Sequence, residues 1–247
     1  MQLFDLTDKN VLITGGTRGI GFAIAQGVKQ AGGRGWIHGS SEDRTRKIAE
    51  ENGFDYLYGD LRDQDGLDGM LRPFLSREDR LDVLINNAGF ETHSAIENAE
   101  EESMDAIYNV NTKSPYFLLQ KLLPALKKAG RASVINVTSI HQKVPVRENG
   151  YYCMAKASLG MFTKVAALEL AKYGIRVNNL APGAILTDMN RELVEAMDFE
   201  QWIPIGRVGR ADELIGPAVF LASDASSYVT GTTLYVDGGY SENLLRY

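Results

Sequence analysis

Short apolar runs rich in β-branched residues alternate along the chain with longer segments whose apolar residues recur at helical spacing. The short runs predict strands over residues 9–16, 33–40, 54–60, 81–89, 131–139, 175–183 and 232–239. The longer segments predict helices over residues 19–32, 62–78, 100–128, 150–173 and 211–222, and Ser40 or Ser41 is expected to cap one more. Residues 184–209 follow neither pattern and are expected to be irregular or to form short helices.

Glycine and proline modify some of these predictions. The glycines within residues 33–40 weaken the case for a strand, because glycine packs poorly in a strand interior. Pro73 is expected to kink the helix that contains it, and Pro115 is expected to break the helix over residues 100–128. Gly174 is expected to end the helix over residues 150–173.

Repeated alternation of strand and helix predicts parallel strands joined by right-handed crossovers. Because the strands are apolar on both faces, helices are expected to cover both sides of the sheet. The predicted fold is therefore of the α/β class: a doubly wound, seven-stranded parallel sheet of the Rossmann type, in one domain over residues 1–247. Ligands of such sheets bind beyond the carboxyl ends of the strands, at the switch point of the strand order. The residues of chemical interest fall at those ends, namely Gly15 to Gly21, Asn86 to Gly89, Ser139, Pro182 and Gly183.

The composition narrows the class of protein. The chain has 247 residues, of which 44% are hydrophobic, and this is enough for one domain with a sizeable core. A net charge of −6 gives no general attraction to nucleic acid or to an anionic membrane. Cys153 is the only cysteine, which suits a reducing compartment, and neither a signal peptide nor an apolar run of about 18 residues is visible. We therefore expect a soluble cytoplasmic protein, without a metal site, that acts on a small molecule.

The segment TGGTRGIG, residues 14–21, joins the first predicted strand to the first predicted helix. A glycine-rich turn at this place lets the backbone approach a pyrophosphate, which the N–H groups and dipole of the helix amino end attract. Its G-x-x-x-G-x-G spacing differs from the common G-x-G-x-x-G fingerprint, and a tight turn that needs small residues is the alternative interpretation. Asp60 and the adjacent Leu61 are expected at the adenine of a dinucleotide, although Asp60 also suits a turn. The loop residues expected to contact the cofactor are Gly15, Thr17, Arg18, Gly19, Ile20 and Gly21.

The second strand ends without the carboxylate that would bind the ribose hydroxyls of NAD. Ser40 and Ser41 follow it and can hydrogen-bond a 2′-phosphate, with Arg18 within reach. The sequence therefore predicts NADP(H) as the preferred cofactor and NAD(H) as the second candidate. An aspartate in place of Gly39 is expected to favour NAD. The alternatives are a helix cap for the serines and a solvated Arg18.

The stretch TSIHQKVPVRENGYYCMAK links the fifth predicted strand to the long helix that follows it. Residues four apart share a helix face, so Tyr152 and Lys156 lie together, whereas Tyr151 is matched by Ala155. A free phenol has a pKa of about 10, and a nearby ammonium or a positive nicotinamide ring lowers that pKa. Tyr152 is therefore expected to exchange a proton with a substrate alcohol while a hydride moves.

Ser139 and Asn111 complete the predicted catalytic set. Ser139 ends the fifth strand and can hydrogen-bond the same substrate oxygen as Tyr152. Asn111, inside NVNTKSPYF, can hold a water that relays the proton. A Tyr-x-x-x-Lys pair by itself is usually an exposed tyrosine beside a solvated lysine. The strand-end serine and the glycine loop favour the catalytic interpretation.

Together these motifs resemble the short-chain dehydrogenase/reductase family over essentially the whole chain. The resemblance rests on TGGTRGIG, NNAG (86–89), NVN (109–111), Ser139, YCMAK (152–156), PG (182–183) and YVTGTTLYVDGG (228–239). It implies the catalytic set Asn111, Ser139, Tyr152 and Lys156, with Lys156 also holding the nicotinamide ribose. It implies Asn87 near the adenosine ribose and further cofactor contacts from Ala88, Gly89, Pro182, Gly183, Ile185 and Thr187. It also implies a homotetramer in which the last helix and strand pack against a neighbouring subunit.

Three stretches look like bacterial glucose 1-dehydrogenases of this family. They are NNAGFE with Glu91, SIHQKVP with His141 and Lys143, and PGAILTDMN with Asn190. A polyhydroxylated substrate requires hydrogen-bonding partners, which these side chains can supply together with Ser139. Each of them could instead be an ordinary polar residue of a surface loop. Residues 184–209 are the expected substrate-binding loop region.

Three functions stay open at this point. The first is an NAD(P)-dependent oxidoreductase that acts on a sugar or polyol, where Arg147 and Arg191 could meet an anionic group. The second is a 3-oxoacyl-carrier-protein or small-ketone reductase, which the cofactor stretch IHGSSED favours. It requires a basic patch at the mouth of the cleft, to which Lys113 could also contribute. The third is a non-catalytic dinucleotide-binding protein, and the intact catalytic set argues against it.

Overall fold

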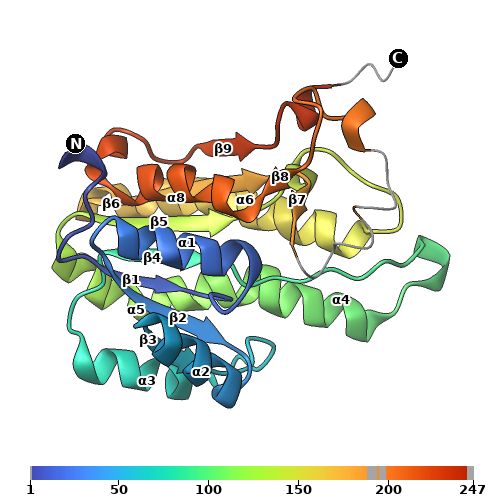
Figure 1. Cartoon of the computed structure of the whole chain (residues 1–247). Helices are drawn as coiled ribbons and strands as arrows, with labels where there is room; N and C mark the ends of the chain where they lie inside the picture. Colours follow the sequence, from blue (N-terminus) through green and yellow to red (C-terminus); the bar gives the residue numbers. More distant parts are fainter. Residues whose placement is uncertain (1, 188–193, 195–198, 244–247) are drawn as a thin grey trace.

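The structure, a computed structural model, describes residues 2–187, 194 and 199–243 (Figure 1). Within these residues, seven parallel strands form one sheet in the order β3-β2-β1-β4-β5-β6-β9. The strands are β1 (Asn10–Ile13), β2 (Arg34–Gly39), β3 (Asp55–Tyr58), β4 (Val83–Asn86), β5 (Ala132–Val137), β6 (Ile175–Pro182) and β9 (Thr233–Val236). The predicted α/β class and doubly wound parallel sheet are confirmed, and the strand order reverses between β1 and β4.

Helices cover both faces of this sheet (Figure 1). They are α1 (Gly19–Gln30), α2 (Glu42–Asn52), α3 (Leu67–Arg77), α4 (Glu101–Tyr108), α5 (Ser114–Ala129), α6 (Gly150–Leu170) and α8 (Ile215–Ala222). Side chains of α1, α2 and α8 form the core on one face, and side chains of α3, α5 and α6 form the core on the other. Strand β1 serves both cores, because Val11 and Ile13 point to one face and Leu12 to the other.

The predicted helix over residues 100–128 is divided, but ahead of Pro115. Asn109–Lys113 form a π-helical turn in which Ser114 N–H donates to the carbonyl of Asn109, and Ser114 Oγ contacts that carbonyl at 2.7 Å. Pro115 lies in the first turn of α5 and has no N–H for the carbonyl of Asn111, four residues earlier. The proline therefore accounts for the break, although the irregular turn precedes it.

Other boundaries differ from the prediction for local reasons. The helix expected from residue 62 begins only at Leu67, because Asp63 Oδ1 accepts hydrogen bonds from the N–H groups of Asp65 and Gly66 and forms a turn. Pro73 lies inside α3 without ending it. In the segment expected to be irregular, two short strands pair, β7 (Ile185–Leu186) and β8 (Gly209–Arg210). Gly174, at φ +72°, follows the last turn after α6 as predicted.

Three asparagines form a buried amide ladder across the middle of the sheet. Asn86 of β4, Asn136 of β5 and Asn179 of β6 stand in register and are at most 2% exposed. Asn86 Nδ2 donates to Asn136 Oδ1 at 2.8 Å, and Asn136 Nδ2 donates to Thr163 Oγ1 of α6 at 2.8 Å. The Thr163 hydroxyl also hydrogen-bonds the side chain of Asn179. The amide ladder therefore ties three strands and α6 together just before the strands end.

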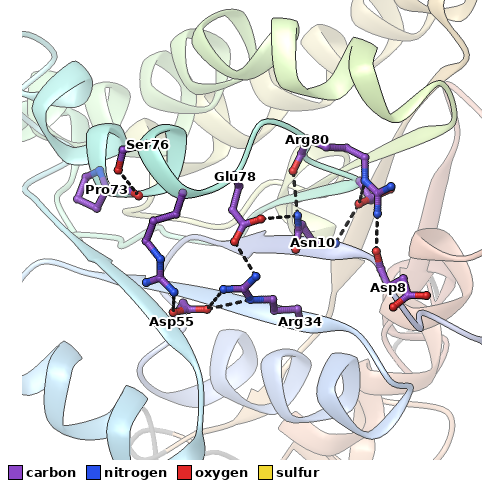
Figure 2. Close-up of polar contacts among 10 residues, drawn as sticks. Asp8, Asn10, Arg34, Asp55, Pro73, Ser76, Glu78 and Arg80 are labelled. Carbon is purple, nitrogen blue, oxygen red and sulfur yellow. Dashed lines mark hydrogen bonds and ion pairs between the residues drawn. The ribbon is translucent and has the colours of Figure 1, made fainter.

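The amino ends of the strands carry a network of charged and polar side chains (Figure 2). Arg34, at the start of β2, pairs with Asp55 of β3 at 3.0 Å and with Glu78 at 2.7 Å. Asn10, at the start of β1, donates from Nδ2 to Glu78 at 2.9 Å and from its backbone N–H to Asp82 at 2.9 Å. Every carboxylate named here has a cationic or amide partner. We call these five residues the amino-end network.

Candidate active site

The glycine loop between β1 and α1 is held against the end of β4. Gly15 and Gly19 have φ values of +63° and +53°, a region in which a side chain is strained. A Cβ on Gly21 would lie 2.3 Å from Asn87 Nδ2, so no side chain fits there. Asn87 Nδ2 in turn donates to the carbonyls of Thr14 and Gly15 at 3.0 and 3.1 Å. The structure thus gives Asn87 a role in shaping this loop, which the resemblance did not imply.

The amino end of α1 faces this loop and suits an anion. Its N-cap residue, Arg18, is extended and makes no side-chain capping hydrogen bond, and the first turn holds no acidic residue. The N–H groups and dipole of such a helix end attract phosphate. Thr187, expected at the nicotinamide, lies across from the loop, because a Cβ on Gly19 would be 3.5 Å from its methyl carbon. Together with the absence of room for side chains in the loop, this arrangement fits the pyrophosphate of a dinucleotide.

The end of β2 leaves two hydroxyl groups exposed. Ser41 is the N-cap of α2, yet its hydroxyl makes no capping bond, and its carbonyl instead accepts from Thr45 Oγ1 at 2.6 Å. Ser40 is exposed beside it. The cap interpretation of these serines therefore fails for their side chains. The aspartate at Gly39 that is expected to favour NAD would require a local shift, because a Cβ there would lie 2.4 Å from Thr45 Oγ1.

Asp60 is engaged by the turn in which it lies. Arg62 donates to both of its carboxylate oxygens, with Nε at 2.9 Å and Nη2 at 2.6 Å from Oδ2. Hydrogen bonds from Arg62 are the main cause that lowers the pKa of Asp60. Leu61 is buried, and its carbonyl accepts from Ser114 Oγ at 2.6 Å. The structure supports the turn interpretation of Asp60.

Lys156, Asn111 and Gly89 converge at the switch point. Lys156 is 3% exposed and donates from Nζ to the carbonyl of Val137, at the end of β5, at 2.9 Å. Asn111 is fully buried, and its amide bonds both backbone groups of Phe90 at 3.2 and 2.8 Å. A Cβ on Gly89 would lie 2.5 Å from Asn111 Oδ1 and 3.3 Å from Lys156 Nζ. The π-helical turn between α4 and α5 thus places Asn111 beside the lysine of α6.

Tyr152 lies one helical turn before Lys156, and its oxygen is hydrogen-bonded by Ser139. Burial is the main cause that raises the pKa of Tyr152 above its usual range, and the Glu91 carboxylate raises it further, whereas Ser139 lowers it. Burial also lowers the pKa of Lys156 to about 8, and Glu91 opposes this shift. The expected lowering of the phenol pKa by Lys156 and the nicotinamide ring stays a prediction. Lys156 Nζ lies 5.5 Å from the centroid of the Tyr152 ring.

Glu91 is fixed by a residue that the sequence did not single out. Asn149, which is 2% exposed, donates from Nδ2 to Glu91 Oε2 at 2.7 Å. Ser94 N–H donates to the carbonyl of Glu148 at 2.7 Å, so the loop after β4 is joined to the amino end of α6. This junction holds the Glu91 carboxylate near enough to raise the pKa of Tyr152.

The structure separates two residues expected to bind substrate. The His141 ring packs edge-on against the Tyr152 ring, with centroids 6.3 Å apart. Its Nδ1 lies 2.8 Å from the carbonyl of Val144, so Nδ1 carries a proton and donates to that oxygen. Lys143 instead forms an ion pair with Glu242. His141 is therefore beside the reactive phenol, and Lys143 is engaged elsewhere.

The remaining candidates are distributed as follows. Gly183 N–H donates to the carbonyl of Val236 at 3.0 Å, so the Pro182–Gly183 turn is anchored to β9. Arg147 and Lys113 are exposed. Asn190 and Arg191 lie outside the described residues.

Comparison with known proteins gives one consistent family. The family model described as enoyl-(acyl carrier protein) reductase matches residues 15–241. The 3-oxoacyl-[acyl-carrier-protein] reductase FabG of Chlamydia pneumoniae is 35% identical, covering 95% of this chain and 97% of that protein. The L-rhamnose 1-dehydrogenase (NAD(P)(+)) of Azotobacter vinelandii is 36% identical, covering 97% and 99%. A crystal structure of gluconate 5-dehydrogenase from Burkholderia cenocepacia, in complex with NADP and tartrate, is 33% identical, covers 98% of each chain and has a TM-score of 0.90.

The chain belongs to the short-chain dehydrogenase/reductase family. Membership of the short-chain dehydrogenase/reductase family confirms the predicted recognition, and it makes the protein an oxidoreductase. It also disfavours the non-catalytic alternative, since Asn111, Ser139, Tyr152 and Lys156 are all present around one switch point. Within the residues that the structure describes, no helix is long and apolar enough to cross a bilayer, and no cluster of His, Cys, Asp and Glu suits a metal ion.

Two residues of this short-chain dehydrogenase/reductase site escaped sequence reasoning. Asn149 contacts Glu91 across a separation of 58 residues, and no periodic pattern signals such a contact. His38 lies under the glycine loop and was passed over as part of an ordinary strand. The one available signal was its position at the end of the second strand, where a buried polar side chain needs partners.

Proposed function

We propose that this protein oxidises a secondary alcohol, or reduces the corresponding ketone, of a sugar or sugar-derived substrate with NADP(H). The observation that carries the proposal is the arrangement of Tyr152, Ser139 and Lys156 beside a fixed Glu91 carboxylate. The first three groups serve the reacting oxygen. The fourth gives a polyhydroxylated substrate a charged acceptor for its other hydroxyl groups.

The proton chemistry follows from the protein groups. Tyr152 with a raised pKa stays protonated near neutral pH, so it can donate its proton to a substrate carbonyl oxygen, and in the reverse direction it receives that proton. Ser139 hydrogen-bonds the same oxygen. Lys156 and Asn111 meet at Gly89, where they can orient the ribose and hold a relay water. The nicotinamide, when bound, supplies or accepts the hydride.

Support for a sugar comes from the groups around Tyr152. Glu91 can accept hydrogen bonds from substrate hydroxyls through its second oxygen, and the His141 ring lies beside the Tyr152 ring. A site with such polar groups rejects substrates that lack the matching hydroxyls, because the polar groups then stay unpaired. The named activities of the rhamnose and gluconate dehydrogenases agree with this substrate class. We propose residues 184–209 as the substrate-binding loop region.

Support for NADP(H) comes from the end of β2. Ser40 and Ser41 expose hydroxyls that no helix cap uses, and Arg18 adds a cation at the glycine loop. The gluconate 5-dehydrogenase structure contains NADP. Ser40→Asp places a carboxylate where a 2′-phosphate would lie, so it should raise the Kd of NADP⁺ and leave that of NAD⁺ nearly unchanged. Ser40→Ala is the matched control without the charge, and equal effects of both variants on both cofactors would contradict this assignment.

The experiment that tests the proposed function is a substrate panel. Initial rates with NADP⁺ and NAD⁺ are followed by the absorbance of the reduced nicotinamide, with aldoses, sugar acids and polyols. Reduction of ketoses, simple ketones and 3-oxoacyl thioesters is followed with the reduced cofactors. We expect turnover of a polyhydroxylated substrate, and its loss in Tyr152→Phe. Activity confined to thioesters would overturn the sugar assignment.

Reduction of a 3-oxoacyl-carrier thioester is the second candidate. The similarity to FabG of Chlamydia pneumoniae favours it. An acidic carrier would meet the exposed Lys113 and Arg147. Charge reversal at these two positions should then weaken the acyl-carrier reaction and leave reduction of a small ketone unchanged.

We further propose a homotetramer that works in the cytoplasm. Met161, Val165 and Leu168 are 58%, 45% and 83% exposed and lie on one side of α6, which supports burial of this side against another subunit. Strand β9 is the other support, because it ends the sheet next to α8. The lone Cys153 suits a reducing compartment. Light scattering coupled to gel filtration measures the assembly, and Leu168→Glu should reduce its mass if α6 is an interface.

A further inference from the structure

His38 is a buried histidine at the end of β2 that the proposed reaction does not use. It is 3% exposed and lies beneath the glycine loop. Its Nδ1 is 3.4 Å from the N–H nitrogen of Gly15, and its Nε2 is 3.0 Å from the carbonyl of Gly59. The carbonyl of His38 accepts from Gly16 N–H at 2.9 Å. His38 therefore contacts the segments that follow β1 and β3, on either side of its own strand.

The partners of the ring determine its protonation. A carbonyl oxygen only accepts, so Nε2 carries the proton that is donated to Gly59, and Nδ1 must accept from Gly15. Burial lowers the pKa of His38 to about 4, while Gly59 and the Asp60 carboxylate oppose this shift. The ring is therefore neutral near pH 7, and one tautomer satisfies both contacts.

Gly15 is the residue at which the glycine loop begins to turn. Its N–H is held by His38, and its carbonyl is held by Asn87 Nδ2 at 3.1 Å. Together the two contacts fix the backbone of Gly15, whose φ of +63° is open mainly to glycine. The loop conformation depends on this residue, because the chain continues directly from it to Gly19 and the amino end of α1.

We propose that His38, through Nδ1, is a positioning residue that sets the glycine loop for the cofactor pyrophosphate. This inference rests on the proposed dinucleotide site. Its competitor is a packing role, in which the imidazole only fills the space between β1 and β3. The two roles predict opposite rankings for two substitutions of His38.

Asparagine and glutamine each put a polar atom near the position of one of the two ring nitrogens of His38. His38→Asn puts Oδ1 near the place of Nδ1, so it keeps the acceptor for Gly15 and loses the donor to Gly59. His38→Gln puts its amide nitrogen near the place of Nε2, so it keeps the donor and leaves Gly15 N–H unpaired. A positioning role makes His38→Gln the worse cofactor binder. A packing role makes His38→Asn worse, because asparagine is the smaller residue.

The measurement is the Kd of NADP⁺ and of NAD⁺ by calorimetry, together with the unfolding temperature of the cofactor-free variants. We expect His38→Gln to raise both Kd values roughly tenfold and His38→Asn to change them less than about threefold. His38→Gln that binds both cofactors like the unmodified protein, or His38→Asn that binds them more weakly than His38→Gln, would overturn the proposal.

A second measurement needs no variant. The chain has three histidines, so ¹⁵N-labelled imidazole spectra can be assigned by substitution. At pH 7 we expect His38 as the neutral Nε2–H tautomer. A charged or Nδ1-protonated His38 would overturn the proposal even if both variants failed to fold. Unmodified protein that binds neither NADP⁺ nor NAD⁺ would instead contradict the proposed cofactor site.

Discussion

The two ends of the same strands use buried polar groups in opposite ways. At the amino ends, Arg34 forms ion pairs with both Asp55 and Glu78 (Figure 2). Asp82 accepts a hydrogen bond from the backbone N–H of Asn10. At the carboxyl ends, Lys156 is buried and donates to the carbonyl of Val137, and burial raises the pKa of the Tyr152 phenol. The first end satisfies its charges inside the protein, and the second leaves titratable groups to be satisfied by ligands.

The amino ends of the strands therefore contribute mainly to stability, and the carboxyl ends carry the reactive groups. A paired carboxylate contributes to folding and has no reason to react, because its partners already compensate its charge. Burying a charged lysine or a phenolate costs free energy, so burial shifts the pKa of each group away from its usual value. Substitutions at the two ends should therefore change different measurements.

Tyr152→Phe should have the largest effect. It removes only the proton-transfer group, and such a group typically contributes about 10²–10⁴-fold to the rate. We expect kcat to fall by this factor while the Kd of NADP⁺ stays close to normal. Tyr151→Phe is the matched control one residue earlier, and it should be nearly as active as the unmodified protein. An inactive Tyr151→Phe would show that the wrong face of α6 has been assigned.

Lys156→Met should change the pH dependence of stability. The pKa of Lys156 is about 8 in the folded protein and near 10.5 when unfolded, so the unfolded chain binds more protons between these values. The free energy of unfolding of the natural chain should therefore rise with pH in this window, by up to about 3 kcal/mol. The methionine variant should lack this rise. Urea unfolding at several pH values from 7 to 10 makes the comparison, and parallel curves would contradict the burial of a charged lysine.

Glu91 should affect substrate choice more than turnover in general. Loss of one charge-assisted contact to a hydroxyl should reduce kcat/KM for a polyhydroxylated substrate by roughly 10–100-fold. Glu91→Ala should be worse than Glu91→Gln, which keeps a weaker acceptor. A simple ketone should react almost unchanged in both variants. Equal losses for sugar and ketone would make Glu91 a structural partner of Asn149.

Asp82→Ala should have the smallest effect and should leave catalysis unchanged. It deprives the Asn10 N–H and the Arg80 guanidinium of an acceptor at the amino end, at a cost of about 1–2 kcal/mol in the free energy of unfolding. Asp79→Ala is the control, because Asp79 is exposed and its partner Lys128 is 3.6 Å away. Urea unfolding and kcat/KM are measured for both. A lower kcat/KM of Asp82→Ala, measured at urea concentrations at which the variant is still folded, would contradict the assignment of stability to one end and catalysis to the other.

The features that sequence analysis predicted are those that local patterns determine. The strand–helix alternation gives the sheet, the glycine spacing gives the loop before α1, and the four-residue spacing distinguishes Tyr152 from Tyr151. These patterns need only neighbours along the chain.

The features that it missed depend on contacts between distant segments. Asn149 reaches Glu91 across 58 residues, and His38 meets Gly15 only when the strands are paired. The burial that raises the pKa of Tyr152 likewise comes from the surrounding fold, and the spacing on α6 gives no sign of it.

The amide ladder of Asn86, Asn136 and Asn179 has a consequence for how the reacting groups are aligned. Side chains alternate between the two faces of a strand, so the smallest slip that keeps each side chain on its own face is two residues. Such a slip would displace a strand by about 7 Å. Such a slip would still bury aliphatic side chains, but it would separate each amide from its neighbour in the middle of the sheet. The ladder therefore fixes the alignment of the strands: it makes mispaired sheets costly and keeps Ser139, three residues beyond Asn136, just past the level at which β4 ends.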